Sequence, residues 1–252
     1  MSTNGHSPFE GPVQTAGDAA RVGEEYKTAV SKIITSHTIN ELYGAQVFDE
    51  PAIALAPNPY EKWLTCRIAM EEYGHHVRFR RLADDLGIEA EKLDAGSGKH
   101  LSIFEYPLEV WPDFLAIKAL ADLAEILQIE DLLECSYIPL RDVARATMPE
   151  EKFHAGYGRS RLEELGKTPE GKVQAQTAID RYFEVMLPFF GRRDSRNNEM
   201  FRKWGVKQRT NGFMRGDYIA RVQQITEELD LAMPPVPEKY QPDLDEFRAS
   251  AS

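Results

Sequence analysis

Apolar residues return every three or four positions along much of this chain, which is the period of an α-helix with one buried face. This pattern predicts a first long helix over residues 18–47. Its apolar face is supplied by Val30, Ile33, Ile34 and Leu42. Beyond a pairing of two-helix halves, we find no internal repeat, no glycine-rich phosphate loop and no heptad run.

Capping residues, prolines and glycines mark where the other helices begin and end. Asn58 before Pro59 predicts a helix start, because asparagine caps the free backbone amides and proline fits the first helical position. Gly87 closes that helix. The remaining predicted helices run from 111 to a break at Pro139, from there to about 166, from 168 to 191, and around 195–205 and 212–230.

The two ends of the chain are predicted to lie outside this helical domain, which spans residues 17–232. Residues 1–16 contain Gly, Ser, Pro and Asn without an apolar core, so we expect a flexible segment and neither a signal peptide nor a membrane anchor. An extended tail over residues 233–252 is predicted from its prolines, Pro234, Pro235, Pro237 and Pro242.

Composition narrows the class of protein. The net charge of −11 would repel phosphate, so nucleic-acid binding is not expected. No apolar run reaches the roughly 18 residues that span a bilayer. Cys66 and Cys135 are predicted to be buried thiols rather than a disulfide, as in a reducing compartment. We therefore expect a cytoplasmic protein without membrane or nucleic-acid partners.

Two Glu-x-x-His steps carry the strongest chemical signal, namely Glu72 to His75 and Glu151 to His154. Side chains three positions apart share a helix face about one turn apart, so a carboxylate and an imidazole can reach one metal ion. One step is a weak sign. Two such steps are the pattern with which four-helix carboxylate proteins hold two iron or manganese ions.

Such a site needs one further carboxylate from each partner helix. Glu41 precedes Glu72 by 31 positions, and Asp122 precedes Glu151 by 29. Glu125 would give a spacing of 26, so it is kept as an alternative and Asp122 is favoured. The predicted metal-binding and catalytic set is Glu41, Glu72, His75, Asp122, Glu151 and His154. It predicts an all-α fold, a ferritin-like four-helix bundle core with additional C-terminal helices.

Three neighbouring residues could also be considered as ligands. Glu71 and Glu150 stand four positions before the two histidines, but this class of site uses the three-residue step, so both are expected to lie off the metal axis. His76 points about 100° away from His75 around the helix, which favours a role outside the ligand set. Without metal, the same residues would be acids and histidines on solvated helix faces.

Several stretches resemble the phenylacetic acid catabolic protein family, in particular catalytic subunits that epoxidise the ring of phenylacetyl-CoA, with a relation to benzoyl-CoA epoxidase. They are residues 40–44 (Asn-Glu-Leu-Tyr-Gly), 71–75 (Glu-Glu-Tyr-Gly-His), 101–107 (Leu-Ser-Ile-Phe-Glu-Tyr-Pro), and 136–139 (Ser-Tyr-Ile-Pro) leading to 150–154, with a weaker echo over 204–211. The Ser-Ile-Phe-x-Tyr-Pro part discriminates best, because ferritins share the ligand spacing. The family's aspartate ligand on the third helix corresponds to Asp122.

The chain also departs from the family. Ile68 stands where the family has a lysine four residues before the second-helix ligand, and Leu123 and Glu125 follow Asp122 where the family has small residues. In addition, catalytic members of the family have a longer C-terminal region. These changes leave all six predicted ligands in place. They affect the prediction of which acyl group the protein accepts and of how it recognises CoA.

The resemblance implies a di-iron oxygenase, with manganese as a possible substitute, that uses O₂ and an external electron donor to oxidise an aromatic acyl-CoA. It also implies a separate reductase and a non-catalytic paralogous subunit. Because an acidic chain needs local positive charge to hold CoA phosphates, we assign that role to Lys99, Arg67, Lys207 and Arg209. Apolar segments at 111–114 and 186–190 predict an exposed partner surface in a homo-oligomer or hetero-oligomer.

Three rival functions share parts of this pattern. A ferritin-type iron store would use the same ligands but lacks the 102–107 stretch. A scaffold subunit of the same complex would lose ligands that this chain keeps. A radical-forming subunit needs a tyrosine beside the metals, for which Tyr73 or Tyr137 are the candidates. An oxygenase of the same family that acts on a non-CoA substrate is the nearest alternative.

Overall fold

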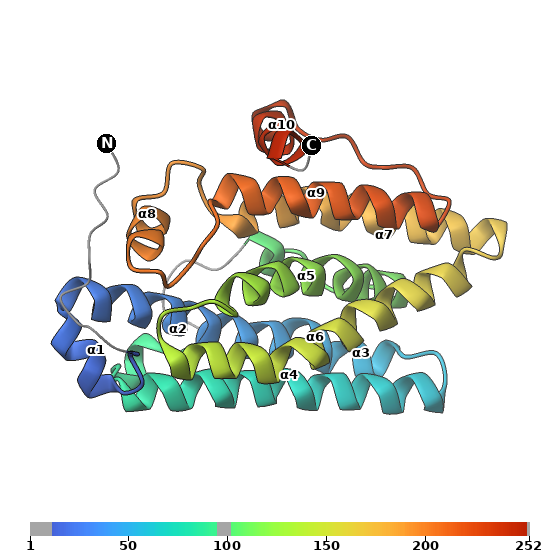
Figure 1. The fold of residues 1–252 in the computed structure, drawn as a ribbon. Helices are drawn as coiled ribbons and strands as arrows, with labels where there is room; N and C mark the ends of the chain where they lie inside the picture. The colour runs from blue at the N-terminus through green and yellow to red at the C-terminus, as the bar shows by residue number, and fades with distance from the viewer. Residues whose placement is uncertain (1–11, 95–101, 251–252) are drawn as a thin grey trace.

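The computed structural model describes residues 12–94 and 102–250 of the 252-residue chain, and within these parts the regular elements are helices. The predicted all-α class is therefore confirmed. Figure 1 shows the helices stacked in layers, with α5 in the interior of the bundle. No helix in the described parts is both long enough and apolar enough to cross a membrane.

The first half of the chain forms a long antiparallel pair of helices. It contains α1 (Ala16–Val22), α2 (Glu24–Gly44), a π-helical turn (Ala45–Asp49), α3 (Glu50–Leu55) and α4 (Pro59–Asp85). The predicted helix over 18–47 is interrupted at Gly23, whose φ of +131° is open to glycine but strained for other residues. It also continues beyond 47, because the π turn leads directly into α3. Asn58 caps α4 through its side chain, as predicted.

The second half supplies the interior and the outer layer. It contains α5 (Trp111–Leu132), α6 (Ile138–Leu165), α7 (Pro169–Met186), α8 (Arg196–Lys203), α9 (Asn211–Glu228) and α10 (Gln241–Ser250). Short 3₁₀ turns lie at Ala90–Lys92, Ser102–Glu105, Leu187–Phe190 and Glu238–Tyr240. Pro139 lies in the first turn of α6, where proline is tolerated, so the break falls between α5 and α6.

Helix pairing places four helices around one interior. α2 packs on α4, α5 packs on α6, and α4 contacts α6, so acids and histidines from all four helices can meet. Gly158 lets α6 approach α5 closely, since a Cβ there would lie 2.6 Å from the backbone nitrogen of Ala119 on α5. α7 and α9 cover the other side of α5, and α10 lies across α9.

The prediction of an extended tail is wrong for its second part. The prolines at 234, 235 and 237 do keep the chain out of helix, but Pro242 stands in the first turn of α10 and starts that helix. Leu244 of α10 is buried, and Phe247 packs edge-on against Phe213 with ring centroids 5.4 Å apart. Packing against α9 therefore stabilises a helix that was not predicted, because the segment is rich in proline.

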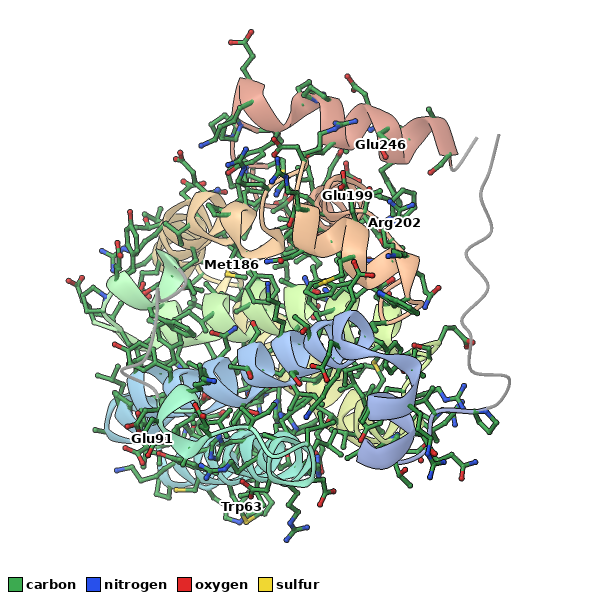
Figure 2. The ribbon with its side chains drawn as sticks, turned by 90° about the vertical axis from the view of Figure 1, so that its left-hand side faces the viewer. Trp63, Glu91, Met186, Glu199, Arg202 and Glu246 are labelled. Atoms are coloured by element: carbon green, nitrogen blue, oxygen red, sulfur yellow. The ribbon has the colours of Figure 1, made fainter. Side chains whose placement is uncertain are left out.

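The partner surface predicted at 111–114 and 186–190 is also wrong in its main members. Phe114, Met186, Leu187 and Phe190 are buried in the core beside α7 and α9, and Figure 2 shows Met186 in the interior. Four of the seven large exposed apolar side chains among the described residues lie on α4, where Trp63 points into solvent (Figure 2). These four are Tyr60, Trp63, Met70 and Val77, and the other three are Tyr106, Val110 and Val173. Cys66 on the same helix is exposed, contrary to prediction, whereas Cys135 is buried, and both are free thiols.

Candidate metal centre

The six residues predicted as ligands meet in the centre of the bundle. α2 contributes Glu41, α4 contributes Glu72 and His75, α5 contributes Asp122, and α6 contributes Glu151 and His154. All six are buried, and both histidines are fully enclosed. Each of the four helices turns its ligand positions inward. A Glu-x-x-His step places both of its ligands on one face of a helix, and these faces of α4 and α6 lie toward each other.

The donor atoms form two overlapping groups, each of which could hold a metal ion. One group contains Glu41, Glu72, His75 and Glu151, and the other contains Glu72, Asp122, Glu151 and His154. The donor atoms within each group lie within 4.8 Å of one another. Because Glu72 and Glu151 belong to both groups, the cluster offers two adjacent positions that share two carboxylates. Glu125 belongs to neither of these groups, but it forms a third candidate group with His37 and Glu41.

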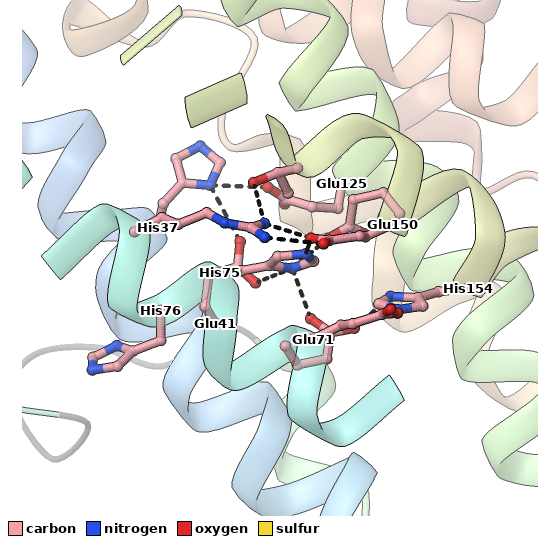
Figure 3. Close-up of polar contacts among 12 residues, drawn as sticks. His37, Glu41, Glu71, His75, His76, Glu125, Glu150 and His154 are labelled. Carbon is pink, nitrogen blue, oxygen red and sulfur yellow. Dashed lines mark hydrogen bonds and ion pairs between the residues drawn. The ribbon is translucent and has the colours of Figure 1, made fainter. Parts of the chain in front are cut away.

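The two histidines are oriented alike, with Nδ1 toward the cluster and Nε2 toward a carboxylate of the facing helix (Figure 3). His75 Nε2 lies 2.9 Å from Glu150 of α6, and His154 Nε2 lies 2.8 Å from Glu71 of α4. Metal-binding histidines usually carry such an outer carboxylate, which fixes the ring and raises its basicity. Glu71 and Glu150 are therefore off the metal axis, as predicted, but the reciprocal role that they have across the helices was missed.

Burial and crowding of like charges shift the proton affinities of the cluster. Burial raises the pKa of Glu151 to about 7, with a further rise from the charge of Glu72. Burial also raises the pKa of Asp122 well above its ordinary value. For His154, burial opposes the charged form, but the carboxylates of Glu71 and Glu72 raise the pKa to about 10. So many buried acids favour a compensating cation.

The donor chemistry fits a metal ion. Nδ1 of both histidines, Oδ2 of Asp122 and Oε1 of Glu151 are buried, and none makes a well-aligned hydrogen bond within the described parts of the chain. Buried polar atoms in folded proteins are normally partnered, so four such atoms that converge on one place suit a bound metal ion. Nitrogen and carboxylate donors together suit iron, manganese or zinc.

A lysine inside the cluster was not foreseen. Lys118 is 2% exposed, and its Nζ lies 2.8 Å from Glu72 Oε1, 3.3 Å from Asp122 Oδ2 and 3.0 Å from Asp49 Oδ1. Asp49 is buried as well and comes from the π turn after α2. The position of Lys118 in an otherwise apolar stretch, four residues before Asp122, was the available signal.

The alternative ligand Glu125 has a different partner. Its Oε1 forms an ion pair with His37 Nδ1 at 2.9 Å, while Glu41 lies 3.8 Å from the same nitrogen. The imidazole stacks on Phe79 with ring centroids 4.7 Å apart. Burial opposes the charge on His37, yet the Glu125 carboxylate raises the pKa of this histidine to about 9. His76 points away from the cluster, and its Nδ1 lies 2.9 Å from the Thr38 carbonyl oxygen.

A small cavity of about 80 Å³ opens beside the cluster. The acids form one wall, together with Lys118 and Asp49. The other wall is apolar and includes Phe48, Ile103, Phe104, Ile117, Met186 and Phe189. Ile103 and Phe104 belong to the 102–107 stretch on which the family resemblance rests most heavily, so that stretch lies next to the candidate metal centre.

Of the four cations assigned to CoA phosphates, the three that the structure describes do not gather on one surface. Lys99 lies outside the described residues. Arg67 donates to Glu71 at 2.8 Å and stacks over Phe153, whereas Arg209 bonds to Asp131 on another part of the molecule. Lys207 is buried, donates to Gln128 and lines a separate cavity. Their role in phosphate binding stays a prediction.

The outer carboxylates allow a direct test of the centre. Replacing Glu71 or Glu150 with glutamine should weaken metal binding by roughly 10–100-fold, because each histidine loses the charge that orients it. The bound metal is measured by titration of the metal-free protein with Co²⁺. The exposed Glu163 on α6 provides the control, since Glu163→Gln should bind like the wild type. Equal affinity in all four proteins would refute the assigned orientation.

Two comparisons with known proteins find similar sequences. The family described as phenylacetic acid catabolic protein matches residues 13–246. One of the subunits of 1,2-phenylacetyl-CoA epoxidase from Escherichia coli strain K12 is 28% identical over 218 residues, which cover 84% of this chain and 70% of that protein. The family match includes every helix that contributes to the cluster. The chain therefore belongs to the phenylacetic acid catabolic protein family.

Proposed function

We propose that this protein is a di-iron oxygenase that inserts one oxygen atom from O₂ into the ring of an aromatic acyl-CoA. The observation that carries the proposal is the pair of buried donor groups that share Glu72 and Glu151. Family membership and the similarity to a protein of an epoxidase complex support the reaction type. Manganese could replace iron at the same donors, because both accept imidazole and carboxylate ligands.

Two iron ions, when bound, supply the redox chemistry that activates O₂. Glu41, Glu72, His75, Asp122, Glu151 and His154 would hold the ions, and Glu72 and Glu151 are the two residues that belong to both donor groups. The outer acids Glu71 and Glu150 keep the imidazoles turned toward the ions. The apolar wall, with Phe48, Phe104 and Phe189, excludes water and offers aromatic and aliphatic contacts to a ring.

The reaction needs reducing equivalents from outside. One oxygen atom enters the ring and the other leaves as water, so each turnover consumes two electrons and two protons. No flavin or nicotinamide fingerprint occurs in the sequence, and two cysteines are too few for an iron–sulfur cluster. We therefore infer a separate reductase, and the relative's place among several subunits of one enzyme supports a partner protein.

The test is oxygen incorporation by iron-loaded protein that is given a reductase system, ¹⁸O₂ and phenylacetyl-CoA. We expect a product that carries one ¹⁸O atom, detected by mass spectrometry. A variant that fills the cavity, Ala121→Phe, should keep its metal. Its turnover should fall at least about tenfold, because the new phenyl side chain occupies the space that the substrate ring needs. Circular dichroism checks its folding. Label-free product from metal-loaded protein would exclude the proposed reaction.

One alternative substrate class follows from the scattered cations. Arg67 and Arg209 are each engaged by protein carboxylates on different parts of the molecule. An aromatic substrate without CoA would need no phosphate contacts. Calorimetry with phenylacetyl-CoA, benzoyl-CoA and free CoA distinguishes the two. Absence of binding to all three, alongside an intact metal centre, would favour an oxygenase for a non-CoA substrate.

A further inference from the structure

Asp49 and Lys118 are a buried ion pair that the proposed ligand set does not use. Asp49 is 2% exposed and Lys118 is equally buried, and their charged atoms are 3.0 Å apart. Both line the cavity beside the candidate metal centre. A buried ion pair rarely adds stability over an apolar pair of the same shape, so its presence here calls for another role.

The backbone brings Asp49 to this place by an uncommon device. Asp49 ends the π-helical turn Ala45–Asp49, eight positions after Glu41. In a regular α-helix, eight positions make two full turns and a further rotation of about 80°. That rotation would point the side chains of Glu41 and Asp49 in different directions. A π turn takes up one extra residue, so the two behave as if about seven positions apart and share a face. Such π turns occur frequently at functional sites.

Lys118 touches ligands from both donor groups. Its Nζ donates to Glu72 Oε1, the same oxygen that lies 3.1 Å from His154 Nδ1, and it also lies 3.3 Å from Asp122. Glu72 belongs to both groups, so a cation bound to it weakens the donor strength available to either metal ion. A fixed positive charge here also repels incoming cations.

The charges of the site balance only when Asp49 is counted. Four ligand carboxylates offset two divalent ions, and Lys118 would then add one positive charge that Asp49 cancels. We propose that Lys118 tunes the donor strength of Glu72 through its direct hydrogen bond, and that Asp49 prevents the charge of this lysine from weakening metal binding. The inference rests on the proposed metal centre and assigns both residues a positioning and charge-balancing role.

A double-mutant cycle tests this role. Wild type, Asp49→Asn, Lys118→Met and the double variant are prepared free of metal and titrated with Co²⁺ by calorimetry and visible absorption. Asp49→Asn should bind Co²⁺ on the order of tenfold more weakly, because the lysine charge is no longer cancelled. Lys118→Met should bind at least as tightly as the wild type and shift the Co²⁺ absorption bands, since Glu72 Oε1 is released.

The double variant is the decisive member, because it restores charge balance. It should return to within about threefold of the wild-type affinity, so that the two changes are strongly non-additive. The opposite result is that both single variants bind Co²⁺ more weakly, that their melting temperatures fall as well, and that the two losses of affinity add in the double variant. The pair would then be merely structural, and the inference would fail. If Lys118→Met does not fold, Asp49→Asn and the double variant still decide. Wild-type protein that binds no Co²⁺ would instead refute the metal centre itself.

Discussion

Replacing Glu72 with alanine is expected to remove both metal ions, because this carboxylate belongs to both donor groups. The wild type should bind about two irons per chain, as four-helix carboxylate sites do. The variant should bind metal more than about 100-fold more weakly than the wild type. This loss is larger than the one expected when an outer carboxylate, Glu71 or Glu150, is replaced with glutamine. Metal content after gel filtration, measured by elemental analysis, gives the result.

Two controls separate loss of a ligand from loss of the fold. Glu163→Ala removes an exposed acid from α6 and should retain both ions. Glu125→Gln should also retain them, whereas Asp122→Asn should not, because Asp122 alone of the two belongs to a group containing His154. Full metal retention in Glu72→Ala, or the reverse behaviour of Asp122 and Glu125, would show that the ligands are assigned incorrectly.

Arg215→Met should destabilise the protein by roughly 3–5 kcal/mol, the range for breaking a buried ion pair from one side. Arg215 of α9 is 2% exposed, pairs with the buried Asp243 of α10, and donates to the Leu187 carbonyl oxygen at 2.8 Å. Removing the guanidinium leaves the Asp243 carboxylate buried without that partner. The free energy of unfolding is measured by urea titration.

Arg193 offers a matched control for the same carboxylate. It binds Asp243 at 2.7 Å, but its side chain is 49% exposed, so Arg193→Met should cost at most about 1 kcal/mol. Adding Asp243→Leu to Arg215→Met should recover part of the stability, because neither buried charge of the Arg215–Asp243 pair then remains. Equal losses for Arg193 and Arg215 would mean that α10 is not held by a buried charge.

Most of the candidate centre could be predicted from the sequence because its geometry is local to single helices. A Glu-x-x-His step has the same shape in any helix, so Glu72 and His75 were bound to share a face. The matched separations of Glu41 and Asp122 from these steps reflect two helices joined by loops of similar length. The stretch at 102–107 was recognised as a family resemblance, but its place in the cavity wall, through Ile103 and Phe104, was not predicted.

Contacts between helices could not be predicted in this way. The crossed pairs of His75 with Glu150 and of His154 with Glu71 depend on the offset between α4 and α6, which no spacing along one helix specifies. The apolar stretch around Lys118 is a sign of burial, but its contacts with Asp49 and Glu72 come from two other elements of the fold. The π turn that turns Asp49 inward leaves no pattern of its own in the residues.

The C-terminal segment and the apolar segments also show which features the sequence predicts and which depend on packing between helices. Proline and glycine predicted most helix limits, but the helix Gln241–Ser250 exists because α9 covers its apolar side and Arg215 binds its acid. Apolar character alone could not tell a partner surface from a core, and Phe114 and Met186 proved to be core. Local periodicity was enough to predict the helices and the types of ligand, since both depend on residues close together in the chain. The buried charges around those ligands depend on how separate helices pack, so they became visible only in the folded molecule.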